Sequence, residues 1–210
     1  MSWSTIVAFT VVAGLLVMSP GPNGVLIAKT VPTSGKPAGF ANVAGFVTAF
    51  YLHGAFVAFG VSVILVRSAE LFFAVKMVGA AYLCWIGIKA LRDAWRGKIA
   101  PVDVVAARRR RTLAKAYAEG FLTNALNPKV SMFYLAAFPQ LVPLGQVTPA
   151  NIFLLVFIHS MLNLVWFSTM VLVFSRLVAL ARVGSFQRWL KAVTGVVFLG
   201  FGAKLATLPP

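Results

Sequence analysis

The chain has 210 residues, of which 60% are hydrophobic and only 11% are charged, and its mean hydropathy is +0.90. Soluble domains average roughly 25% charged residues, so this composition excludes a water-soluble core of this size. The net charge of +15 would indicate a nucleic-acid partner in a soluble protein. Here the Lys and Arg residues lie between apolar runs, which is typical of topology signals that contact anionic membrane lipid, and we expect no nucleic acid.

Six long apolar segments follow one another along the chain. They cover residues 4–31, 38–66, 69–91, 116–142, 149–175 and 187–208. A helix of ~20 apolar residues crosses ~30 Å of hydrocarbon, and none of the segments alternates as a barrel strand does. The sequence therefore predicts an all-α, multi-pass integral membrane protein of about six transmembrane helices. We expect residues 1–210 to form a single transmembrane domain.

Proline interrupts the first and the fourth segments. Residues 19–23 read Ser-Pro-Gly-Pro-Asn, and residues 124–129 read Asn-Ala-Leu-Asn-Pro-Lys. Because proline removes a backbone donor and clashes with the preceding turn, it frees carbonyl groups that need partners inside the membrane. Broken helices of this kind often line a substrate or ion site, although a simple kink is the alternative. The candidate substrate-binding residues are Pro20, Gly21, Pro22, Asn23, Asn124, Asn127, Pro128 and Lys129.

The second segment carries small residues at helical spacing. Ala41, Gly45, Ala49 and His53 recur at every fourth position, which favours close helix packing. His53 also has a counterpart in His159 of the fifth segment. Ionisable residues inside a membrane are unfavourable and so indicate function by default. These two histidines are candidate proton-coupling residues, and a role as hydrogen-bonded packing residues stays open.

The basic residues divide the chain and predict its orientation. Residues 97–115 form the one substantial polar stretch, a basic linker between halves that cover about 1–96 and 116–210. Counted by connection, fifteen of the 19 Lys and Arg residues lie between segments 1 and 2, 3 and 4, or 5 and 6. Loops rich in Lys and Arg stay in the cytoplasm, so these three connections are predicted to be cytoplasmic and both termini to lie outside.

The two halves resemble each other. A shift of 106 residues aligns Gly14 with Gly120, Pro22 with Pro128 and His53 with His159, and a shift of 115 aligns Gly87 with Gly202. Three spans is an odd number, so a second copy of the unit must enter the membrane from the opposite side. The sequence therefore predicts an inverted repeat of three plus three spans, with helices 1 and 4 broken, which is an arrangement common in alternating-access transporters.

Two motifs carry a family resemblance: Met-Ser-Pro-Gly-Pro-Asn at residues 18–23 and Leu-Thr-Asn-Ala-Leu-Asn-Pro-Lys at 122–129. With Phe-Pro-Gln at 138–140, the chain resembles the LysE/RhtB family of amino-acid exporters over essentially its whole length. The resemblance implies a place in the bacterial cytoplasmic membrane and export of small amino acids such as homoserine, threonine or leucine, driven by the proton motive force. It makes an amino acid and protons the expected partners, and a homodimer stays open.

Lys129 directly follows Pro128, and two roles are open for it. Its ammonium can pair with a substrate carboxylate, or it can neutralise carbonyl groups that the break releases. Catalysis finds little support, because the four acidic residues lie at or beyond the segment ends and form no acid-base pair. We therefore expect no enzyme activity, metal site or cofactor. The alternatives are a membrane enzyme acting on lipid-linked substrates and a passive channel.

Overall fold

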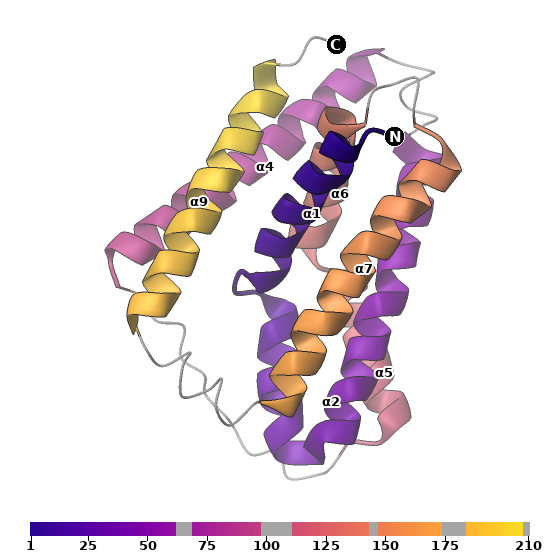
Figure 1. Cartoon of the computed structure of the whole chain (residues 1–210), viewed down its shortest axis with the longest axis vertical. Coiled ribbons are helices and arrows are strands. Elements are labelled where there is room, and N and C mark those ends of the chain that lie inside the picture. Colours follow the sequence, from indigo (N-terminus) through magenta and orange to yellow (C-terminus); the bar gives the residue numbers. More distant parts are fainter. Residues whose placement is uncertain (62–68, 98–110, 143–146, 174–183, 208–210) are drawn as a thin grey trace.

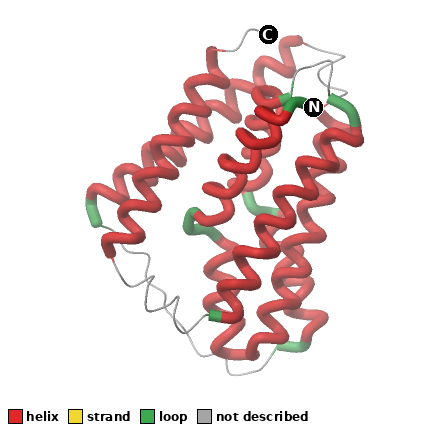
Figure 2. Tube along the Cα trace, viewed as in Figure 1, coloured by secondary structure: helices red, strands yellow, loops and turns green. Residues whose placement is uncertain are grey.

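The computed structural model describes residues 1–61, 69–97, 111–142, 147–173 and 184–207. In these ranges the ordered elements are helices, without a strand (Figure 2). In chain order they are α1 (Trp3–Met18), α2 (Pro22–Phe56), the π-helix η1 (Val57–Val61), α4 (Ala69–Trp95), α5 (Leu113–Ala125), α6 (Pro128–Leu141), α7 (Pro149–Leu172) and α9 (Gly184–Thr207). The prediction of an all-α protein is confirmed for this part of the chain.

Hydroxyl side chains cap the N-termini of α1, α5 and α7. Ser2 accepts a hydrogen bond from the backbone N–H of Thr5 at the start of α1. Thr112 and Thr148 do the same for Lys115 in α5 and Asn151 in α7. Each bond satisfies one of the backbone donors that a first helical turn leaves open. These local signals fix where the helices begin.

Helix α2 consists of two legs joined at Gly35. That residue has φ 85° and ψ 172°, a conformation open essentially only to glycine. The first leg leads from Pro22 to the turn, and the second leg reverses direction and ends at Phe56 (Figure 1). The predicted connection between the first two segments, residues 32–37, lies at this turn. The first predicted segment is therefore divided between α1 and the first leg of α2.

The helices alternate in direction along the long axis of the molecule (Figure 1). α1 and the first leg of α2 descend in that view, the second leg of α2 ascends, and α4 descends. α5 and α6 then ascend, α7 descends and α9 ascends. The N-terminus and the last turn of α9 lie toward the upper end. The turn of α2 and the first turn of α5 lie at the lower end.

The helix ends at the lower end of the molecule are tied together by Arg111. Its guanidinium forms a salt bridge of 2.6 Å with Glu119 in α5. It also donates to the Thr33 hydroxyl at 3.1 Å, and its backbone N–H donates to the Ser34 hydroxyl at 3.0 Å. Both hydroxyl groups belong to the α2 turn. The start of the second half is thus bonded to the turn of the first.

Glycines let two pairs of helices approach closely. A Cβ atom on Gly45 of α2 would overlap the backbone oxygen of Tyr117 in α5, and one on Gly120 of α5 would overlap that of Asn42 in α2. The small face predicted around Gly45 is therefore confirmed as a packing surface. α4 and α9 meet in the same way, because a Cβ atom on Gly87 would lie 2.9 Å from the backbone oxygen of Gly195.

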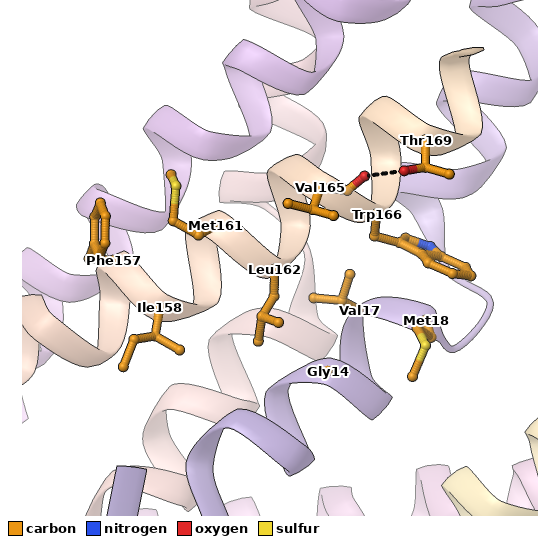
Figure 3. Close-up of a pocket in the computed structure, with 10 residues that line it drawn as sticks. All are labelled: Gly14, Val17, Met18, Phe157, Ile158, Met161, Leu162, Val165, Trp166 and Thr169. Carbon is orange, nitrogen blue, oxygen red and sulfur yellow. Dashed lines mark hydrogen bonds between the residues drawn. The ribbon is translucent and has the colours of Figure 1, made fainter. Parts of the chain in front are cut away.

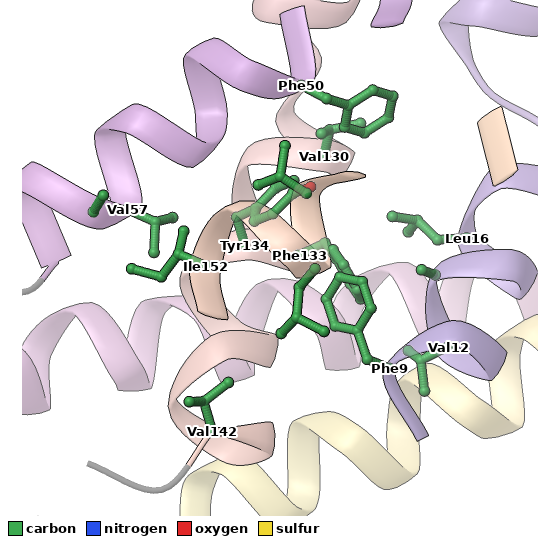
Figure 4. Packing of buried hydrophobic residues seen from close by; sticks show 14 of the residues in the cluster. Phe9, Val12, Leu16, Phe50, Val57, Val130, Phe133, Tyr134, Val142 and Ile152 are labelled. Atoms are coloured by element: carbon green, nitrogen blue, oxygen red, sulfur yellow. The ribbon is translucent and has the colours of Figure 1, made fainter. Parts of the chain in front are cut away.

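The largest apolar cluster lies where α1, α2, α6 and α7 converge (Figure 4). Phe9 and Leu16 come from α1, Phe50 from α2, and Phe133 from α6. All four are at most 2% exposed. In Figure 4 these side chains point toward one another from helices that are far apart in sequence. The cluster packs against the two broken regions and fixes their positions.

Two helices are long and apolar enough to cross a membrane by length and composition among the described residues, Pro22–Phe59 and Pro149–Leu172. α1 is apolar but shorter, and the fourth predicted segment is divided between α5 and α6. Most of the predicted basic linker lies outside the described residues. Of Phe138, Pro139 and Gln140, only the helical backbone is described.

Candidate functional site

The first break separates α1 from α2. α1 ends at Met18, and Ser19 is its C-cap. The Ser19 backbone N–H donates to the backbone oxygen of Leu15 at 3.0 Å, and the Ser19 hydroxyl donates to that of Leu16 at 2.9 Å. Pro20 and Gly21 then lead to Pro22, the first residue of α2. Gly21 is the N-cap residue of α2, and as a glycine it has no side chain with which to cap the helix. The N-terminus of α2 therefore presents backbone donors and the positive end of its dipole at the break.

The second break repeats this arrangement 106 residues later. α5 ends at Ala125, and α6 begins at Pro128, as α2 begins at Pro22. Here a side chain does cap the helix, because the Asn127 carbonyl oxygen Oδ1 accepts from the backbone N–H of Lys129 at 3.1 Å. Asn127 is 4% exposed. It is therefore a buried helix cap, which stabilises a helix start by ~1 kcal/mol.

The two breaks contact each other through crossed hydrogen bonds. Asn23, the second residue of α2, donates from Nδ2 to Asn124 Oδ1 at 3.0 Å. Lys129, the second residue of α6, donates from Nζ to the backbone oxygen of Ser19 at 2.9 Å. Asn23 and Lys129 occupy the same position under the 106-residue shift. In each half, the residue after the proline therefore bonds through its side chain to the other half. Asn23 reaches the end of α5, and Lys129 reaches the end of α1.

The two breaks meet at a junction formed by Ser19, Asn23, Asn124 and Lys129. Asn124 is the polar centre of this junction. It is fully buried, and its Nδ2 donates to the backbone oxygen of Phe46 at 2.8 Å. Its own backbone oxygen lies 3.1 Å from His53 Nε2, so that nitrogen is the donor in this bond. Asn124 of α5 is therefore bonded to both legs of α2. A buried asparagine with these partners can exchange them for a polar ligand without carrying a charge.

The two candidate histidines have different surroundings. The ring of Tyr134 lies between them, with its centroid 5.9 Å from that of His53 and 5.6 Å from that of His159. His159 is fully buried, and neither ring nitrogen has a hydrogen-bond partner among the described residues. Phe50 and Phe133 pack on it at 4.3 and 5.2 Å. His53 therefore reaches the junction, whereas His159 lies in the aromatic cluster behind it.

Four further buried oxygen atoms have no hydrogen-bond partner among the described residues. They belong to Thr30, Asn42, Asn163 and Thr194, each at most 2% exposed. Asn23 Oδ1 is a fifth. The sequence analysis did not single out Asn42 or Asn163, although an asparagine inside a charge-free apolar segment is a signal that would have found them. Ser19 was also missed as the partner of Lys129.

A groove between α1 and α7 has a different character (Figure 3). Its volume is about 480 Å³, and Gly14, Val17, Leu162 and Trp166 line it with other apolar residues. The hydroxyl of Thr169, the one polar side chain besides the Trp166 indole, donates to the backbone oxygen of Val165 at 2.8 Å. This groove therefore suits hydrocarbon and lacks the partners that an amino acid needs. The candidate site is the junction of the breaks.

The described residues hold no group of three or more His, Cys, Asp and Glu side chains placed to bind a metal ion. Two interrupted helices that meet inside an apolar bundle are typical of membrane transport proteins. The chain belongs to the LysE type translocator family, whose match covers residues 15–208. The resemblance read from the two motifs is thereby confirmed.

Similar proteins come from several bacteria. An uncharacterized membrane protein of Pseudomonas aeruginosa is 30% identical over 95% of this chain and 94% of its own length. The threonine efflux protein of Escherichia coli strain K12 is 24% identical over 90% of both chains. The homoserine/homoserine lactone efflux protein of Salmonella typhimurium is 26% identical over 95% of both chains. No solved structure matches this chain.

Proposed function

We propose that the chain is a secondary exporter that moves small amino acids or their derivatives, threonine and homoserine first, out of the bacterial cytoplasm. The observation that carries the proposal is the pair of crossed contacts, Asn23 to Asn124 and Lys129 to Ser19. They gather polar groups from both halves inside an apolar bundle, and a zwitterion requires donors and acceptors together. The relatives named for efflux of threonine and of homoserine support this choice of substrate.

We infer that the bundle consists of two inverted halves of three spans each. Two observations support this architecture: α2 and α6 begin at prolines 106 residues apart, and the segments of the first half run opposite to those of the second (Figure 1). In transporters of this design, one half rocks against the other around a fixed site. The junction is buried here, so a substrate reaches it when the halves separate on one side.

Protons are the proposed coupling ion, with His53 and His159 as the coupling residues. His53 touches the junction through the backbone oxygen of Asn124, at 3.1 Å. A change in its protonation alters a bond that holds α5 against α2. His159 has no polar partner among the described residues and would act only after the aromatic cluster opens. We therefore assign His53 the leading role.

The proposal is tested by efflux from cells loaded with threonine-containing dipeptides, with intracellular and extracellular threonine measured over time. Cells that express the chain should release threonine faster than cells with an empty vector, even against a higher external concentration. A protonophore should slow this release. Leu154→Ala, on an exposed face of α7, is the control that should match the parental chain.

The same experiment separates the alternatives. A passive channel equalises the two concentrations but cannot sustain efflux against a gradient. A membrane enzyme acting on lipid-linked substrates leaves amino-acid release unchanged. If a panel of amino acids shows no accelerated efflux in cells whose membranes contain the protein, the exporter proposal is wrong.

A further inference from the structure

The ammonium group of Lys129 lies at the junction with one hydrogen-bond partner among the described residues. That partner is the backbone oxygen of Ser19, at 2.9 Å. The ammonium lies against Gly21, since a Cβ atom there would lie 3.4 Å from Lys129 Nζ. An ammonium has three donors, so this cation can donate to further acceptors.

No described carboxylate neutralises this cation. Glu119 pairs with Arg111 at the lower end of the bundle. Glu70 and Asp93 lie in the first and last turns of α4, and Asp103 is outside the described residues. A charge inside a membrane protein is stable when an opposite charge or several dipoles surround it. The junction therefore has an unmet preference for an anion.

The opposite side of the junction offers an acceptor. Asn23 is 6% exposed, and its Oδ1 has no partner among the described residues while its Nδ2 is held by Asn124. Asn23 stands at the N-terminus of α2, where backbone donors also favour an anion. A neutral amide acceptor on one half and an ammonium on the other match the two charged ends of a zwitterion.

We propose that Lys129 binds the substrate carboxylate and selects by charge, so that the site accepts zwitterionic amino acids and rejects those with a net positive charge. The inference rests on the proposed export function and assigns the specificity of that same site. When a carboxylate arrives, the ammonium exchanges its bond to Ser19 for an ion pair. A second cation on the substrate would meet Lys129 with no acidic side chain of the described residues to offset the repulsion.

The test uses the full-length chain purified and reconstituted into liposomes, with uptake of labelled threonine measured against unlabelled competitors. Threonine, threonine amide and lysine are the competitors, because threonine amide differs from threonine only in lacking the carboxylate. In the parental protein, threonine should compete at least about tenfold better than threonine amide or lysine, since a buried charge would otherwise stay unpaired. This arm needs no variant that must fold.

Lys129→Gln should remove the discrimination. We expect weaker competition by threonine and a ratio of threonine to threonine amide that falls toward one. Lys115→Gln removes the same charge from an exposed position near the start of α5 and is the matched control. Its ratio should stay at the parental value. The melting temperature in detergent is measured for each variant, so that loss of folding is recognised.

Two outcomes would overturn the inference. One is a parental protein that takes lysine or threonine amide as well as threonine. The other is a Lys129→Gln variant that keeps the parental ratio. If that variant also binds both ligands more weakly by the same factor, Lys129 is only a structural contact to Ser19. In each of these cases threonine transport itself persists, whereas failure of the proposed function appears as absence of threonine uptake by the parental protein.

Discussion

At the scale of single residues, the junction depends on asparagine side chains that bond across the two halves. Asn124 has the most partners, since it contacts Asn23, the backbone of Phe46 and His53. All of these groups are buried. A buried polar group that loses its partner costs about 1–3 kcal/mol of stability. Removing one asparagine side chain would leave its partner groups unpaired in the same way.

We expect Asn23→Ala and Asn124→Ala each to lower the stability of the protein by about 1–3 kcal/mol, with the larger effect for Asn124→Ala. Asn124→Ala leaves both Asn23 and the Phe46 carbonyl without their partner. The double variant should lose less than the sum, because the two side chains share one bond. Melting temperatures of the four proteins in one detergent measure this coupling. Additive shifts would mean that the two side chains do not interact.

The sequence predicted where the chain breaks but not which residues of the two breaks contact each other. Proline and glycine rules act locally, so the breaks at Pro22 and Pro128 could be predicted from neighbouring residues alone. The partner of Asn23 could not. Asn124 and Asn127 were both candidate residues, and the structure gives the contact to Asn124 and makes Asn127 a cap of α6. Which residue faces the junction depends on the rotation of each helix, and packing against other helices sets that rotation.

At the scale of helices, close approach of α2 and α5 brings the junction together. Gly45 and Gly120 lie in that contact, each against the other helix's backbone. The sequence predicted the small face of α2 by its spacing. The sequence did not predict that the chain stays helical up to and beyond a turn at Gly35. Glycine permits many backbone conformations, and the packing of both legs of α2 selects the one found there.

Gly120→Ala should disrupt this contact. The new Cβ atom would overlap the backbone of Asn42, which cannot move without separating the helices, and overpacking of this kind typically costs ~1–3 kcal/mol. Gly14→Ala is the matched control, because Gly14 is the repeat-related glycine and no atom lies within 4 Å of its added Cβ. We expect a lower melting temperature and reduced threonine efflux for Gly120→Ala only. Equal behaviour of the two variants would contradict the packing argument.

At the scale of the whole molecule, the Lys and Arg residues concentrate in three of the connections between the predicted segments. The turn of α2 and the start of α5 belong to two of these connections, and both lie at the lower end of the molecule in Figure 1. The N-terminus lies toward the opposite end. The loop charge predicts that the lower end faces the cytoplasm, and this prediction depends on the membrane and not on details of packing.

The distribution of Lys and Arg along the chain predicts that the start of α5 faces the cytoplasm and the start of α7 faces outward. In a chain carrying Cys84→Ala, which removes the single cysteine, Ala114→Cys and Ala150→Cys place one thiol at each end. Both positions are exposed, so access to a reagent depends on the side of the membrane. In spheroplasts, an impermeant maleimide should label Ala150→Cys at once. It should label Ala114→Cys only after detergent is added. Threonine efflux by both variants before labelling shows that each is folded. The reverse labelling pattern would contradict the orientation predicted from the loop charge.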